Sequence, residues 1–179
     1  MKSKTGKILL VFCAACLAVA AYADSVHFKG KDSPNYTVPK PTPLTLQQCG
    51  SLSGLGNQDL CITLTAIGQP KGNCVNPAGQ SKVPGQNPAP VAVSGSLAVP
   101  ASQIKNGNLS YCVTTADPFA PTDTIAGAPD CPNTSWTERV VSISFTQATV
   151  TVAQPSNCTV QPPDPSTVKL TQTDSLPGL

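Results

Sequence analysis

The sequence predicts an all-β fold, a disulfide-stabilised Ig-like β-sandwich of about six or seven strands with long loops rich in Pro and Gly. Three observations predict it. Val and Thr, which favour strands, and Pro, Gly and Asn, which favour turns, are abundant. Apolar and polar residues alternate with a period of two in several short segments. An even number of cysteines follows the N-terminal leader. A small β-barrel is the second choice.

The first residues have the pattern of a secretory signal peptide, which we expect to be cleaved from the chain. Three lysines precede an apolar run from Ile8 to Ala21, and small residues flank Tyr22, so cleavage is expected after Ala23. The run has about fourteen residues, whereas a membrane-spanning helix needs about twenty. We therefore expect residues 1–23 to be a leader, and the protein to be secreted, periplasmic or attached to the cell surface without a transmembrane span.

A lipid-modified cysteine is the alternative interpretation of this leader. Cys16 would then be the first residue of a bacterial lipoprotein. The position three residues before it holds Cys13 rather than Leu, and an apolar stretch would remain on the mature chain. Both features disfavour lipoprotein anchoring at Cys16.

Removal of the leader changes the charge of the chain. The whole sequence has 11 basic and 9 acidic residues, and the leader takes three lysines and no acids, which leaves 8 against 9. The charges are scattered and form no basic run, so nucleic acid is not an expected partner. The remaining 156 residues, 179 minus 23, suit one domain. Four prolines predict a tail at 24–43, followed by a single β domain at 44–172 and a frayed end at 173–179.

The strands are predicted from alternation and turn residues. The expected segments are Leu44–Gln48, Asp59–Ile67, Val91–Pro100, Leu109–Thr115, Arg139–Thr146 with a continuation through 148–152, and Val168–Thr171. The alternation slips by one residue at Thr146-Gln147, which predicts a β-bulge or a tight turn. Asn106-Gly107 is the strongest turn signal in the chain. Two long Pro-rich loops, Gly68–Pro90 and Ala116–Asn133, are expected to form a contact face, because rigid scaffolds commonly present function on loops.

The cysteines after the leader are expected to form three disulfides rather than a zinc site. They are Cys49, Cys61, Cys74, Cys112, Cys131 and Cys158. No two of them have the close spacing of zinc ligands, and the single histidine, His27, lies near the expected cleavage site. The pairing hypothesis joins Cys61 to Cys112, Cys74 to Cys131, and Cys49 to Cys158.

No catalytic or cofactor-binding arrangement is evident in the sequence, so we expect no enzyme and no cofactor. A lone His27 in a proline-rich segment is a poor general base. Four acids lie in or beside one loop region and could converge in a calcium site or a glycosidase pair. They are Asp117, Asp123, Asp130 and Glu138. Trp136, near the same loop, is the candidate glycan-contact residue, although a loop-covering tryptophan is the more common use.

These observations predict a secreted or surface-associated, non-enzymatic β domain with a structural or interaction role. Its partner would be a protein or a surface whose identity the sequence does not indicate. The alternative is a ligand-binding module for glycan or calcium that uses the loops around Trp136.

Overall fold

The computed structural model describes residues 25–31, 34–40, 44–84, 88–125, 131–177 and 179. Within these ranges the chain is all-β, with only two short 3-10 turns, η1 and η2. The longer strands are β3 (Gln47–Ser53), β4 (Leu60–Val75), β6 (Val91–Val99), β7 (Leu109–Thr114), β9 (Thr137–Ala153) and β10 (Val168–Ser175). The short elements are β1 (His27–Phe28), β2 (Asn35–Thr37), β5 (Ser81–Pro84), β8 (Thr124–Ile125), η1 (Ala101–Gln103) and η2 (Pro165–Thr167). The expected leader, with Cys16 and the cleavage site at Ala23, lies outside the described residues.

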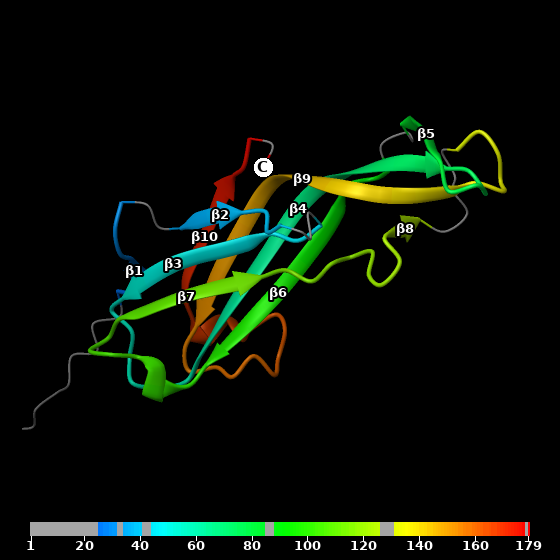
Figure 1. Ribbon diagram of the computed structural model, residues 1–179. Coiled ribbons are helices and arrows are strands. Elements are labelled where there is room, and N and C mark those ends of the chain that lie inside the picture. The colour runs from blue at the N-terminus through cyan, green and yellow to red at the C-terminus, as the bar shows by residue number, and fades with distance from the viewer. Residues whose placement is uncertain (1–24, 32–33, 41–43, 85–87, 126–130, 178) are drawn as a thin grey trace, which may run out of the picture.

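The strands form two antiparallel sheets that pack as a sandwich (Figure 1). In the small sheet, β3 is central, with β7 along one side and β1 and β2 along the other. In the large sheet, the order is β10, β9, β4 and β6. The two sheets do not close into a barrel. The predicted sandwich is therefore confirmed, and the barrel that was the second choice is not formed.

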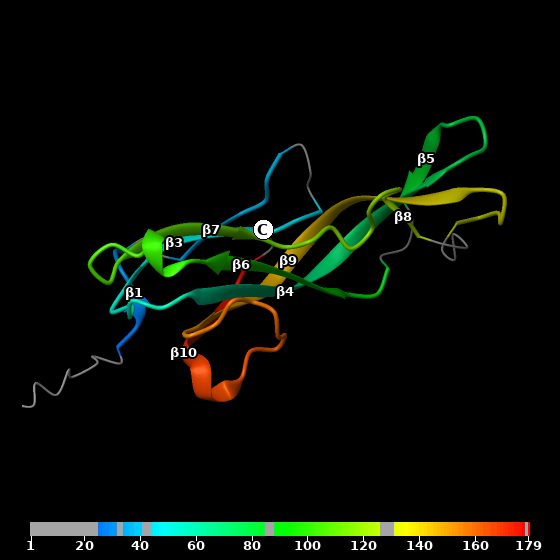
Figure 2. The same cartoon turned by 90° about the horizontal axis from the view of Figure 1, so that it is seen from below.

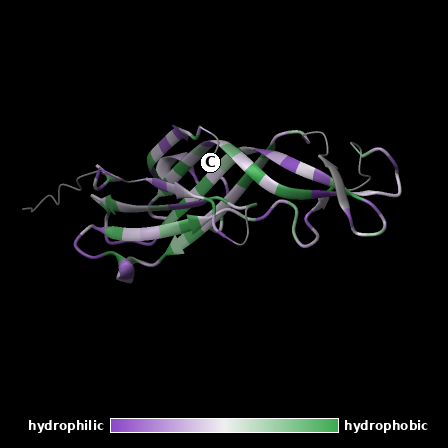
Figure 3. Cartoon of the chain, turned by 45° about the horizontal axis from the view of Figure 1, so that its top comes forward, coloured by the Kyte–Doolittle hydropathy of each residue, from purple (hydrophilic) through white to green (hydrophobic). Residues whose placement is uncertain are grey.

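The core lies between the sheets and is supplied by alternate residues of each strand. Figure 3 shows apolar and polar residues alternating along the long strands. Among the described residues, the largest fully buried Leu, Ile, Val and Phe side chains are Leu46, Leu52, Leu60, Ile62, Leu64, Phe145, Val150 and Val152. Burying each such side chain contributes roughly 1.5–3 kcal/mol, so this alternation accounts for the formation of both sheets.

The predicted slip at Thr146-Gln147 is a β-bulge. Ile67 pairs with Gln147 and the next residue, Gly68, pairs with Phe145, so Thr146 is the extra residue. A second shift follows, where Lys71 pairs with Ser142 and Gly72 with Val140. A bulge bends its strand without ending it. As a result, β9 is one continuous strand that includes both predicted segments, Arg139–Thr146 and 148–152, and it extends beyond the sandwich.

Residues 68–75 of β4 and 137–145 of β9 form a projecting arm (Figures 1 and 2). The prediction of a loop from Gly68 to Pro90 is wrong for residues 68–75, which continue β4, and for Ser81–Pro84, which form β5. Pro70 is tolerated there because β6 pairs with β4 only as far as Gly68, and β5 pairs with β4 only from Asn73 onward. At Pro70, β4 therefore pairs with β9 only and has no neighbouring strand on its other side. A missing backbone N–H loses no inter-strand hydrogen bond on that unpaired side.

Both ends of the described chain belong to the sandwich, contrary to the expected tail and frayed end. β1 and β2 pair with β3, and Val26 is only 8% exposed. The Tyr36 hydroxyl donates a hydrogen bond to Asp174 Oδ2 at 2.7 Å, which joins β2 to β10. β10 extends to Ser175, and the following residue, Leu176, is buried at 6% exposure. Backbone pairing at sheet edges places these segments, which lack a strong apolar pattern.

The turn at Asn106-Gly107 is confirmed. Both residues have positive φ, 51° and 72°, and the flanking Lys105 and Asn108 exchange two backbone hydrogen bonds of 2.9 Å. Glycine and asparagine adopt this conformation at low cost, which explains the strength of the signal.

The disulfides join Cys49 to Cys112, Cys61 to Cys158, and Cys74 to Cys131. The expected Cys74–Cys131 pair is present. The expected Cys61–Cys112 and Cys49–Cys158 pairs are wrong. Cys61 and Cys112 both face outward, but from different sheets, so the sandwich separates them. None of the three described disulfides crosses between the sheets, which distinguishes this sandwich from antibody domains.

Candidate functional site

The tip of the arm is a candidate interaction site, because the two Pro-rich segments predicted as loops meet there. β5 pairs with the end of β4, and β8 pairs with the beginning of β9. The Cys74–Cys131 disulfide links β4 to the segment that precedes β9, with a Cα–Cα distance of 5.6 Å. Cys74 itself is fully buried. The bridge therefore holds the two segments together at the far end of the molecule from η1.

A hollow of about 400 Å³ lies in this part of the arm. It is lined by Leu44, Asn73, Val75, Gly79, Asp123, Arg139, Val140 and Val141. Val141 is the extra residue of the second bulge and is 41% exposed. The hollow thus combines one carboxylate, one guanidinium, one amide and an exposed apolar side chain. Such a mixed lining suits contact with a polar chain or surface, and it holds no nucleophile–base pair.

The three described acids that the sequence singled out, Asp117, Asp123 and Glu138, do not form one cluster. Asp117 Oδ1 accepts a hydrogen bond from the Phe119 backbone at 2.8 Å, an ordinary turn contact. Glu138 is fully buried in β9, where its side chain lies against Gly72. Asp123 lines the hollow, and Asp130 lies outside the described residues. Among the described residues no cluster of three or more metal-ligating side chains occurs.

Trp136 and His27 lie apart from each other. Trp136 directly precedes β9 at the tip, is partly exposed, and donates its backbone N–H to Asn133 at 3.0 Å. It does not line the 400 Å³ hollow. His27 is exposed in β1, and its ring nitrogen lies 2.7 Å from the Ser25 carbonyl oxygen. Neither residue has a described partner that would give it a catalytic role.

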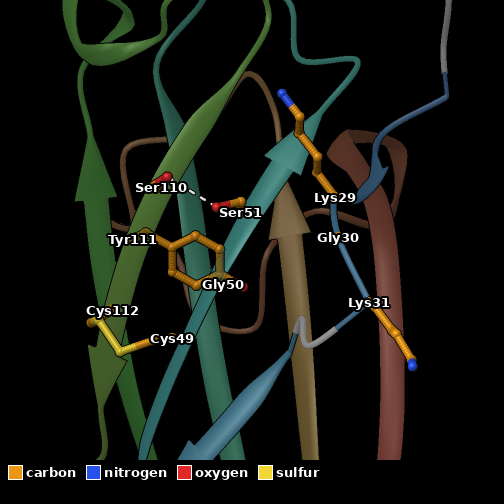
Figure 4. Close-up of a pocket in the computed structure, with 9 residues that line it drawn as sticks. All are labelled: Lys29, Gly30, Lys31, Cys49, Gly50, Ser51, Ser110, Tyr111 and Cys112. Atoms are coloured by element: carbon orange, nitrogen blue, oxygen red, sulfur yellow. Dashed lines mark hydrogen bonds between the residues drawn. A yellow bond between two sulfur atoms is a disulfide. The ribbon is translucent and has the colours of Figure 1, made fainter.

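A second hollow, of about 640 Å³, lies on the outer face of the small sheet (Figure 4). The Cys49–Cys112 disulfide crosses from β3 to β7 at its floor, and the Ser51 and Ser110 hydroxyls are 2.9 Å apart. Lys29 and Lys31 stand beside it on the segment after β1. Sequence reasoning missed these lysines, because they lie in the segment interpreted as a spacer. The available signal was their closeness in the chain, although Gly30 between them has a φ of 97°, so the segment bends there and the two side chains diverge (Figure 4).

Two tyrosines lie behind this face, where Tyr111 is buried and Tyr36 is partly buried. Burial raises the pKa of Tyr111 to about 12. Burial and the hydrogen bond to Asp174 raise the pKa of Tyr36 well above its usual value. Tyr111 is paired directly with Gly50 in the β3–β7 ladder, and Figure 4 shows its ring beside that glycine. Both groups are therefore neutral structural side chains at ordinary pH.

The fold and these sites define the chain as an all-β sandwich stabilised by three disulfides, which are typical of an oxidising, extracellular environment. No family model matches the chain, and no curated protein or solved structure matches it either. Among the described residues, no helix has the length and apolar character needed to cross a membrane.

Proposed function

We propose that this chain is an exported, non-enzymatic β domain with a structural or interaction role, and that the tip of its arm contacts the partner. The observation that carries the proposal is the 400 Å³ hollow, whose lining comes from both Pro-rich segments. The Cys74–Cys131 bond restrains these segments before binding, which lowers the entropic cost of association.

Export is part of this proposal. The leader pattern of residues 1–23 and the three disulfides both support it, since disulfides persist in oxidising compartments. The partner is a protein or a surface molecule met outside the cytoplasm. A glycan is the alternative partner, supported by the partly exposed Trp136 beside the tip.

Photo-crosslinking from defined positions tests the proposed contact. A photoreactive amino acid replaces Val141 at the tip in one variant and Thr171 in another, since Thr171 is exposed on β10 in the sandwich. The proteins are exposed to the cell surface and the culture medium of the source. We expect one adduct of defined mass from position 141 and none from position 171. Arg139→Glu, which reverses a charge in the hollow, should reduce that adduct.

Equal capture from both positions, or no capture from position 141, would contradict the assignment of the tip. Calorimetry with calcium and with a glycan panel then separates the partner classes. Heat released with a glycan, and lost in Trp136→Ala, would favour the alternative over a protein partner.

A further inference from the structure

The Cys49–Cys112 disulfide differs from the other two in its surroundings. It links directly paired residues of adjacent strands, with a Cα–Cα distance of 4.1 Å, and lies on the solvent side of the small sheet. Cys112 is exposed and Cys49 is partly exposed. Both cysteines line the hollow of about 640 Å³, whose volume is large enough for a small molecule (Figure 4). A thiolate can therefore approach this bond without any movement of the fold.

The other two disulfides each include one buried cysteine. Cys61 is 1% exposed and Cys74 is fully buried. Attack on the accessible sulfur of either bond would release a thiolate at the buried residue, where loss of water disfavours the charge. The Gln161 amide lies 3.5 Å from Cys61 Sγ, but a single weak donor does not replace hydration. Only the Cys49–Cys112 bond has both residues in contact with solvent.

The charge around the hollow favours an anionic thiol. Lys29 and Lys31 are among the nine residues that line it, and no acid is among these nine. A third hollow, of about 610 Å³, adjoins the 640 Å³ hollow and shares Lys29, Ser51 and Ser110 with it. Its lining adds Lys105. The Lys29 and Lys105 ammonium groups donate hydrogen bonds to Asn108 Oδ1 and the Ser102 carbonyl. The net positive charge of these three lysines attracts anionic molecules to the face that carries the disulfide.

The small sheet does not depend on this bond for its strand pairing. β3 and β7 pair over six residues, from Gln47 with Thr114 to Leu52 with Leu109. Side-chain contacts flank the disulfide on both sides, Gln47 to Thr114 at 3.2 Å and Ser51 to Ser110 at 2.9 Å. The bond can therefore open while the ladder and the core beneath it persist.

We propose that Cys49–Cys112 is a reactive disulfide that exchanges with small anionic thiols. A thiolate attacks Cys112 Sγ and forms a mixed disulfide as the Cys49–Cys112 bond breaks, and the electron pair leaves on Cys49 Sγ. A second thiolate then attacks the sulfur of the bound small thiol and releases Cys112 as a thiolate. The two protein sulfurs take up two electrons, and two small thiols are oxidised to their disulfide.

Glutathione is the probe for a direct test. The oxidised full chain, carrying Cys13→Ser and Cys16→Ser so that it has no other thiols, is incubated with reduced glutathione and quenched with an alkylating agent. Peptide mapping then follows each bond. We expect Cys49 and Cys112 to be alkylated at least about tenfold faster than the other four cysteines, with a transient glutathione adduct on Cys112. Near-ultraviolet circular dichroism should retain the folded spectrum.

Equal or faster opening of Cys61–Cys158 or Cys74–Cys131 would overturn the proposal, as would loss of the folded spectrum when Cys49–Cys112 opens. The Cys49→Ser, Cys112→Ser double variant should remain folded and should release no thiol under the same conditions. Lys29→Gln with Lys31→Gln should slow the reaction with glutathione several-fold but not with the neutral thiol 2-mercaptoethanol. Equal slowing with both thiols would refute the role of the lysines.

Discussion

Gly95 of β6 lies against the backbone of Thr114 in β7, where a Cβ atom on residue 95 would be 2.0 Å from the Thr114 carbonyl oxygen. This close approach brings the edges of the two sheets together. The neighbouring backbone bond, from the Ala116 N–H to the Ser94 carbonyl at 2.8 Å, lies at the same corner. A glycine here is required by space, because no side chain fits between the two strands.

Gly95→Ala is expected to destabilise the protein by about 3 kcal/mol, the upper end of the usual cost of overpacking, because backbone atoms must move to accept the methyl group. Urea unfolding followed by tryptophan fluorescence measures the change. Ser96→Ala is the matched control on the same strand, where the exposed side chain should change stability by less than about 0.5 kcal/mol. Similar unfolding midpoints for the two variants would show that the corner is not tightly packed.

Gln154, which follows β9, holds the segment before β4 through its side-chain amide. Its Nε2 donates to the Gly56 carbonyl at 2.9 Å and to the Gln58 carbonyl at 2.6 Å, and its Oε1 accepts from the Gly56 N–H at 2.8 Å. Gln154→Glu places a carboxylate against two carbonyl oxygens and should cost about 1–3 kcal/mol. Gln147→Glu, at an exposed position of β9, should be nearly neutral. Thermal unfolding of both variants tests this, and equal melting temperatures would contradict it.

The raised pKa values of the buried Tyr111 and the partly buried Tyr36 predict a loss of stability at high pH. The pKa of each is raised in the folded state, to about 12 for Tyr111, whereas an unfolded tyrosine titrates near 10. In the folded state, the two tyrosine hydroxyls therefore keep their protons to a higher pH than in the unfolded state. This contribution to stability is complete below pH of about 10 and is lost as the pH rises through the folded-state values.

The absorbance of ionised tyrosine, measured on the full chain, tests this effect. The chain carries Tyr22→Phe, so that only Tyr36 and Tyr111 contribute to the signal. At pH 10 the native protein should show almost no tyrosinate, while the urea-unfolded protein should be about half ionised. Tyr36→Phe and Tyr111→Phe assign the two groups. A native protein whose two tyrosines titrate near pH 10 would contradict the raised pKa values.

Loss of the arm disulfide should loosen the arm and leave the sandwich ordered. Cys74→Ala with Cys131→Ala removes a restraint worth about 2–4 kcal/mol. Hydrogen exchange should accelerate in residues 68–75 and 137–145 and remain unchanged in β3 and β7. Faster exchange throughout both sheets would instead show that the arm and the sandwich unfold as one unit.

Local patterns in the sequence were enough for the strands with strong alternation. In β4, the alternate residues Leu60, Ile62 and Leu64 are buried, as a period of two requires. In β9, the bulge at Thr146 was visible in the sequence as a one-residue shift in the alternation. The turn at Asn106-Gly107 follows from the low cost of positive φ at these residues. These features depend on near neighbours in the chain, so the amino-acid order alone determines them.

The tertiary structure decided which distant segments meet. The strand from Gly68 to Val75 contains Pro70 and two glycines and reads as a loop, yet pairing with β9 makes it extended. Tyr36 and Asp174, in segments expected to be tails, join the two sheets because each segment adds to an open sheet edge.

The cysteines show the same division. Their even number indicated three bonds, whereas the partner of Cys112 depended on which sheet each strand joined. Alternation gives the side of a strand on which a residue lies, but it carries no information on the neighbour across the ladder. Cys49 and Cys112, 63 positions apart, become partners only through the register of β3 and β7.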